Sequence, residues 1–168
     1  MDGIGVLTDG FGRIGGLVHG VLDGLGEQEL TARLGPEANT IAWLVWHLAR
    51  VEDAQVADLA GTEQVWHAQG FADRFALPFD RGATGYGQSP DEVAQVRADA
   101  SLLGEYADAT RAATDAYLAT LEDADLARVV DERWDPPVTV GVRLVSVLGD
   151  VLEHAGQAAY VRGVVTGR

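Results

Sequence analysis

The amino-acid sequence predicts an all-α protein, a four-helix bundle. Four segments repeat apolar side chains at intervals of three and four residues, which is the period of an amphipathic helix. Capping residues, glycine and proline separate these segments, and no alternating pattern typical of strands competes with them. The chain has 168 residues, of which 47% are hydrophobic. This length and composition suit one domain, residues 1–168, with a full hydrophobic core.

The first two helices are expected at residues 4–25 and 40–60. The first carries its apolar stripe from Ile4 to Leu25, although each of its many glycines costs about 1 kcal/mol in a helix interior. Asn39 is the expected N-cap of the second helix, and Gly61 is expected to end it.

A long irregular connection, residues 61–88, follows the second helix. It contains several glycines and scattered aromatic residues, so it is expected to pack over the bundle. Its length allows the second and third helices to run parallel.

The third and last helices have clear start signals. Ser89-Pro90-Asp91-Glu92 combines a serine N-cap, proline at the first helical position and glutamate at the third, and predicts a helix from there to about Leu121. After the Asp135-Pro136-Pro137 break, Thr139 can cap a helix that extends to about Val165.

The charge of the chain excludes several function classes. There are 26 acidic and 12 basic residues, the latter all arginine, and the net charge is -14. Nucleic acid and anionic membranes both need a basic surface, so neither is an expected partner. Residues 1–25 do not resemble a signal peptide, and no apolar run reaches the roughly 18 residues that cross a bilayer. By elimination, a cytoplasmic location is expected. The chain contains no cysteine, which excludes disulfides, thiolate ligands and a cysteine nucleophile.

Three residues are candidates for a divalent-metal site: His47, Asp150 and His154. Asp150 and His154 are four residues apart on the predicted last helix, so a carboxylate and an imidazole lie one above the other. A third ligand has to come from another helix, as in other bundle-core sites, and His47 in its apolar run is the natural candidate. Spacing alone leaves two alternatives open: His47 as a hydrogen-bonded core residue, and Asp150 with His154 as an ordinary surface pair.

Other polar residues are expected to have structural roles. Glu52 and Arg162 fall near the core-facing stripes of their helices, so Arg162 is expected to pair with Glu52 or Asp53. His19 lacks an acidic neighbour at ligand spacing and is expected to be structural or exposed.

Two segments resemble the DinB-like superfamily of four-helix proteins. Residues 39–53, NTIAWLVWHLARVED, resemble its second-helix signature, and residues 150–163, DVLEHAGQAAYVRG, resemble its closing helix. The superfamily includes mycothiol- and bacillithiol-dependent S-transferases and mycothiol-dependent maleylpyruvate isomerases. The resemblance implies an up-down-down-up bundle, a metal ion held by three histidines, and a homodimer.

The ligand set departs from that pattern at one position. His47 matches the first histidine and His154 the last, but Asp150 stands where histidine is commonest. Two histidines and one carboxylate can still bind zinc, nickel or manganese and leave positions for water or substrate. The side chains expected around these ligands or in the adjoining pocket are Glu52, Gln157, Arg162, Trp43 and Trp46.

The resemblance therefore implies a metal-dependent S-transferase or isomerase whose partners are a small thiol, such as mycothiol, and an electrophilic substrate. Because the chain has no cysteine, the thiol has to be supplied from outside. The alternative is a non-catalytic bundle that binds a small ligand or dimerises and whose metal site is degraded by Asp150.

Overall fold

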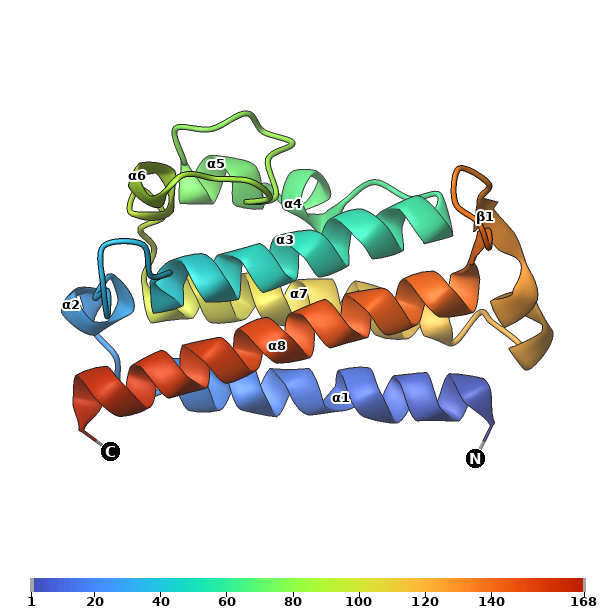
Figure 1. Ribbon diagram of the computed structural model, residues 1–168, viewed down its shortest axis with the longest axis horizontal. Coiled ribbons are helices and arrows are strands. Elements are labelled where there is room, and N and C mark those ends of the chain that lie inside the picture. Colours follow the sequence, from blue (N-terminus) through green and yellow to red (C-terminus); the bar gives the residue numbers. More distant parts are fainter. Residues whose placement is uncertain (1, 168) are drawn as a thin grey trace.

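The computed structural model describes residues 2–167 and confirms the all-α prediction. Within that range, four long helices form the bundle: α1 (Gly3–Leu22), α3 (Ile41–Ala60), α7 (Ala100–Leu118) and α8 (Val140–Thr166). Figure 1 shows α1 and α8 running one way along the bundle and α3 and α7 running the other way, the predicted up-down-down-up order. Each long helix contacts two neighbours, because α3 and α1 both pack against α7 and α8.

Short elements fill the connections. They are α2 (Glu27–Leu30), α4 (Val65–Ala68), α5 (Phe71–Phe75), α6 (Pro90–Val93), the 3-10 helix η1 (Asp123–Ala127), β1 (Val129–Asp131) and β2 (Val138–Thr139). The antiparallel pair β1–β2 lies at the end of the bundle where α8 begins (Figure 1). It corrects the expectation that no strand forms.

Two helix boundaries differ from the predictions by one to three residues. α1 ends at Leu22 instead of Leu25, and Thr40, whose hydroxyl accepts from the backbone N–H of Trp43, caps α3 in place of Asn39. Gly61 ends α3 in the left-handed conformation, as predicted. α8 begins after its predicted cap, Thr139.

The third helix starts ten residues later than predicted. The capping box of Ser89 and Glu92 forms, but it begins only the short α6. α7 has its own N-cap, Asp99, whose carboxylate accepts from the backbone N–H of Leu102, and it ends at Leu118 instead of Leu121. Val93 and Val96 are buried, so the segment between the two caps packs into the core without continuing the helix.

The connection of residues 61–88 folds over α3 as expected, although α4 and α5 give it some helical structure (Figure 1). Its aromatic residues Trp66, Phe71 and Phe75 are buried and surround the ring of Tyr106 on α7. None of the helices in residues 2–167 is long and apolar enough to cross a membrane.

Candidate metal centre

His47 lies in the middle of α3 and is buried. Its Nδ1 is 2.5 Å from the backbone oxygen of Thr84, in the connection that covers α3. Because a carbonyl oxygen can only accept a hydrogen bond, Nδ1 carries the proton in the neutral ring. The lone pair is then on Nε2, the nitrogen available to bind a cation.

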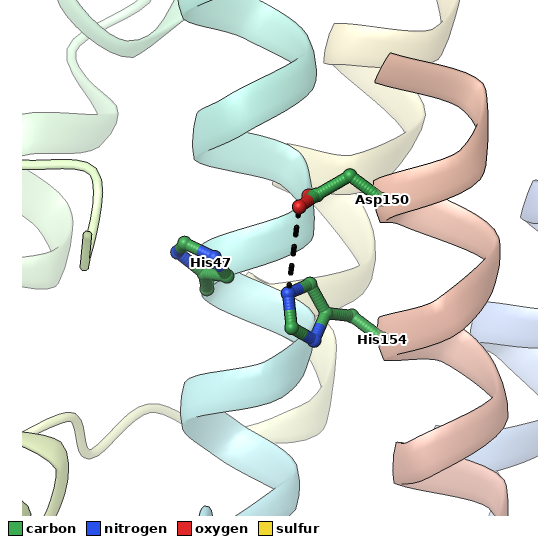
Figure 2. Close-up of side chains that lie close together, drawn as sticks. All are labelled: His47, Asp150 and His154. Carbon is green, nitrogen blue, oxygen red and sulfur yellow. Dashed lines mark ion pairs between the residues drawn. The ribbon is translucent and has the colours of Figure 1, made fainter. Parts of the chain in front are cut away.

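Asp150 and His154 lie one turn apart on α8, with Asp150 Oδ1 3.7 Å from His154 Nε2 (Figure 2). The Nδ1 of His154 is 3.1 Å from the side-chain oxygen of Gln157, one turn further along the helix. That oxygen accepts from Nδ1–H, so Nε2 of His154 also keeps its lone pair and faces the carboxylate. Gln157 therefore holds His154 in much the same way that Thr84 holds His47.

The three candidate ligands come together between α3 and α8, as Figure 2 shows. One ligand atom from each of His47, Asp150 and His154 lies within 4.8 Å of the other two, and the two imidazole rings are 4.8 Å apart between centroids.

The second carboxylate oxygen, Asp150 Oδ2, is buried and has no hydrogen-bond partner among the residues that the structure describes. An unpaired buried polar atom costs about 1–3 kcal/mol, and more when the group is charged. A divalent cation would supply the missing partner. The donor set of two imidazole nitrogens and a carboxylate therefore fits such an ion.

The environment keeps His47 neutral. Burial lowers the pKa of His47, and the neighbouring His154 lowers it further, while the hydrogen bond to Thr84 and the charge of Asp150 act in the opposite direction. A lowered pKa leaves the imidazole unprotonated at neutral pH. This is the form that binds metals.

Trp43 forms a wall beside both histidines. Its indole stacks on His47, with ring centroids 4.4 Å apart, and meets His154 edge-on at 6.1 Å. The indole Nε1–H donates to the side chain of Gln88, at 2.7 Å. Trp46 is also buried, but its ring packs on Trp66 in the covering connection.

Gly85 allows the covering connection to reach His47. Its φ is +97°, and a Cβ added there would lie 2.6 Å from His47 Nδ1 and 3.2 Å from Trp43 Cζ2. Any larger residue at this position would both strain the backbone and push the Thr84 carbonyl away from the imidazole. Sequence reasoning did not identify Thr84 or Gly85, because nothing in the connection indicates which backbone oxygen faces the ring.

Two of the side chains expected around the ligands contact other groups. Glu52 accepts a 2.7 Å hydrogen bond from the hydroxyl of Thr114 on α7, and Arg111 is 4.0 Å away. Arg162 donates to the backbone oxygens of Val21 and Asp23 at the end of α1, both at 2.7 Å. The expected pairing of Arg162 with Glu52 or Asp53 is therefore wrong, because free carbonyls at a helix end satisfy the guanidinium instead.

His19 on α1 is exposed and lies 2.8 Å from Asp108 on α7. It takes no part in the cluster of His47, Asp150 and His154, which we refer to as the His47 cluster. Its acidic partner is 89 residues away in the sequence, which is why spacing on one helix did not reveal it.

A cavity of about 570 Å³ opens beside His47 and Asp150. Residues of α3, of the covering connection, of the β1–β2 hairpin and of α8 line it. Its volume lies within the range typical of small-molecule sites. Two of the three candidate ligands, His47 and Asp150, therefore border a space that a substrate could occupy.

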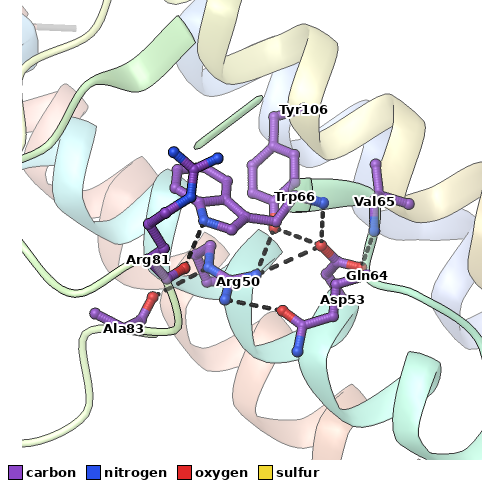
Figure 3. A network of polar contacts seen from close by, with 8 residues as sticks. All are labelled: Arg50, Asp53, Gln64, Val65, Trp66, Arg81, Ala83 and Tyr106. Carbon is purple, nitrogen blue, oxygen red and sulfur yellow. Dashed lines mark hydrogen bonds and ion pairs between the residues drawn. The ribbon is translucent and has the colours of Figure 1, made fainter. Parts of the chain in front are cut away.

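A second polar cluster holds the connection on α3 (Figure 3). Arg50 donates to the backbone oxygen of Ala83 and to the side chains of Gln64 and Tyr106. Asp53 accepts from the backbone N–H groups of Val65 and Trp66, both at 2.8 Å. We refer to these contacts as the Arg50–Asp53 network.

Comparison with known proteins adds two findings. A family model described as mycothiol S-transferase matches residues 16–167. A crystal structure of a conserved protein from Enterococcus faecalis is similar over 100% of this chain and 99% of that one, with 32% identity and a TM-score of 0.93. A comparison with curated proteins found no match.

Proposed function

This chain belongs to the mycothiol S-transferase family of DinB-like proteins, and from that premise we propose that it is a divalent-metal-dependent thiol S-transferase. His47, Asp150 and His154 are the proposed ligands. Mycothiol is the proposed thiol, and an electrophilic small molecule is the second substrate. The candidate metals are zinc, nickel and manganese, which all accept imidazole and carboxylate ligands.

One observation carries the proposal: a buried carboxylate oxygen, without a partner among residues 2–167, lies beside two imidazoles whose Nδ1 atoms are already engaged. Histidines with purely structural roles tend to use both ring nitrogens in hydrogen bonds. Here the unused Nε2 lone pairs and Asp150 share one small volume, next to a cavity.

The chemistry can be divided between the ion and the chain. A bound divalent cation lowers the pKa of a coordinated thiol, so that the nucleophilic thiolate forms near neutral pH. Thr84 and Gln157 orient the two imidazoles through their Nδ1–H groups, and Asp150 balances the positive charge. The cavity beside His47 is the proposed place for the electrophile, next to the metal ligands.

The proposed transfer forms one carbon–sulfur bond. In substitution, the thiol sulfur bonds to the electrophilic carbon while the leaving group departs with the electron pair of its bond. When the thiol instead adds to a conjugated double bond, the sulfur bonds to one carbon and the electron pair of the double bond moves to the neighbouring carbon. That carbon then takes up a proton. In both cases the thiol proton passes to solvent. Reversible addition of this kind would also support an isomerase.

The decisive assay is thiol-dependent conjugation. Wild-type protein with mycothiol and several electrophiles is expected to react at a rate that chelation removes and added metal restores. Asp150→Ala and His154→Ala are expected to abolish that rate. Glu153→Ala, which removes an exposed carboxylate from α8, the helix that carries Asp150 and His154, is the matched control and should leave the rate unchanged.

A protein that binds metal but shows no metal-dependent conjugation with any electrophile would contradict the enzyme proposal. A protein whose ligand binding and unfolding both ignore chelators would instead favour the non-catalytic bundle.

The proposal includes a homodimer in the cytoplasm, built from one helical domain per chain, residues 1–168. The family resemblance supports the dimer, and use of a reduced thiol supports the location. Light scattering on tag-free protein tests the dimer, and a mass of one chain at micromolar concentration would contradict it.

A further inference from the structure

Aromatic side chains in this protein are mostly buried, but three are exposed within residues 2–167. They are Tyr86, Trp134 and Tyr160, with exposed fractions of 94%, 65% and 69%. Tyr86 and Trp134 line the cavity of about 570 Å³ beside His47 and Asp150, whereas Tyr160 lies outside it on α8. Two of the three exposed aromatic rings thus adjoin the candidate metal centre.

These two rings come from separate parts of the chain that are both anchored nearby. Tyr86 follows Thr84, which accepts from His47, and precedes Gln88, which accepts from Trp43. Trp134 lies in the loop between β1 and β2, next to Arg133, whose guanidinium bonds Asp131 through two hydrogen bonds. The backbone therefore positions each ring at the cavity even though neither ring is packed into the core.

The cavity is lined by apolar as well as polar side chains, and seven of its fifteen lining residues are apolar, the two rings among them. The aliphatic residues that line it are Val51, Ala54, Val138, Val142 and Val147. On the hairpin side of the cavity, the Asp131 carboxylate is shared by two arginines, since it lies 2.7 Å from Arg133 and 3.9 Å from Arg143 on α8. A ligand with a flat apolar surface gains contact with the rings and the aliphatic groups there.

We propose that Tyr86 and Trp134 form a ring-binding subsite that makes the protein selective for planar apolar electrophiles, aromatic or conjugated. This inference rests on the proposed S-transferase function for the reaction itself. The two residues are specificity determinants, because they contact the body of the substrate and leave the metal ligands untouched.

The test measures binding separately from reaction. 1,3-Dinitrobenzene is planar and has no leaving group, so its dissociation constant is measured by equilibrium dialysis with wild-type, Tyr86→Ala, Trp134→Ala and Tyr160→Ala protein. Loss of one stacking partner is expected to raise the dissociation constant about threefold to tenfold in the first two variants. Tyr160→Ala is the matched control for an exposed aromatic ring and should not change it.

A second readout uses two electrophiles with mycothiol. The KM for 1-chloro-2,4-dinitrobenzene should rise in Tyr86→Ala and Trp134→Ala, while that for iodoacetamide, which has no ring, should not. No binding to wild-type protein, unchanged binding in both variants or equal weakening in Tyr160→Ala would overturn the subsite. Ring binding that depends on both residues in a protein without conjugation activity would retain the subsite and refute the proposed function.

Discussion

Helix α3 carries two polar clusters that begin only three residues apart, and they differ in how completely they are satisfied. In the Arg50–Asp53 network, neither named residue has a buried side-chain nitrogen or oxygen without a partner in the described chain. In the His47 cluster, Asp150 Oδ2 has no partner in the part of the chain that the structure describes, and both histidines keep an Nε2 that no described residue uses. We call the Arg50–Asp53 network closed, because the polar atoms of these two residues are satisfied, and the His47 cluster open, because it has polar atoms that are not.

This difference separates architecture from function. A closed network fixes the covering connection on α3 and needs nothing from outside the protein. An open cluster next to a cavity retains a cost that a bound ion can remove. If the distinction is correct, substitutions in the network should mainly change the free energy of unfolding, and substitutions in the cluster should mainly change metal binding.

The largest effect on unfolding is expected for Asp53→Ala. It removes the carboxylate that accepts from Val65, Trp66 and Tyr106 and leaves the fully buried Arg50 without its charge partner. Breaking a buried pair in this way costs about 3–5 kcal/mol. Urea unfolding of metal-free protein measures it, and Asp58→Ala should remain within about 0.5 kcal/mol of wild type. Equal values for the two variants would refute the structural role of the network.

The next largest effect is a pH dependence set by Glu52. Burial raises its pKa from 4.5 to about 7, against the opposing hydrogen bond from Thr114. Between these two values the folded state holds a proton that the unfolded state has released, so the free energy of unfolding falls as pH rises from 4.5 to 7. The loss is at most about 3 kcal/mol. Glu52→Gln should flatten the curve in that window, and an unaltered slope would contradict the assignment.

Gly85→Ala tests the contact between the covering connection and His47, and Gly87→Ala is its matched control. Both positions have positive φ, but only a Cβ at Gly85 meets His47, since nothing lies within 4 Å of one at Gly87. Gly87→Ala should cost about 1–2 kcal/mol of unfolding free energy through backbone strain alone. Gly85→Ala should cost more and should also weaken metal binding about tenfold or more, because it displaces the Thr84 carbonyl. Calorimetric titration with zinc would detect this, and equal affinities would contradict it.

The smallest effect on unfolding is expected for Asp150→Ala in metal-free protein. Within the described residues the side chain makes one 3.7 Å contact with His154 and has an unpaired oxygen whose cost disappears with it, so its loss should lower the free energy of unfolding by no more than about 1 kcal/mol. Urea unfolding in the presence of a chelator measures this value. Destabilisation as large as that of Asp53→Ala would assign Asp150 to the architecture instead.

The fold was largely predictable from local signals, with one instructive failure. Gly61 and Thr139 mark helix ends that the structure retains, because each needs only a left-handed residue or a capping hydroxyl. The capping box at Ser89 is equally clear, yet it specifies where a helix begins and not how long it continues. A second cap at Asp99 and the burial of Val96 decide where α7 begins, and that burial depends on tertiary packing.

The candidate site was predictable only in part. Periodicity placed Asp150 and His154 on one face of a helix, and the structure brings His47 to them. The partners of the histidines include a backbone oxygen, which no residue type reveals. The different partners of Glu52 and Arg162 likewise depend on how α7 and the end of α1 meet the other helices.

The most direct test of the central claim is the metal content of tag-free protein, measured by elemental mass spectrometry beside Asp150→Ala and His154→Ala. The open-cluster account predicts about one zinc, nickel or manganese ion per chain in wild-type protein, as expected for a three-ligand site, and loss of that ion in both variants. Wild-type protein that contains no metal and takes up none when it is added would contradict the account.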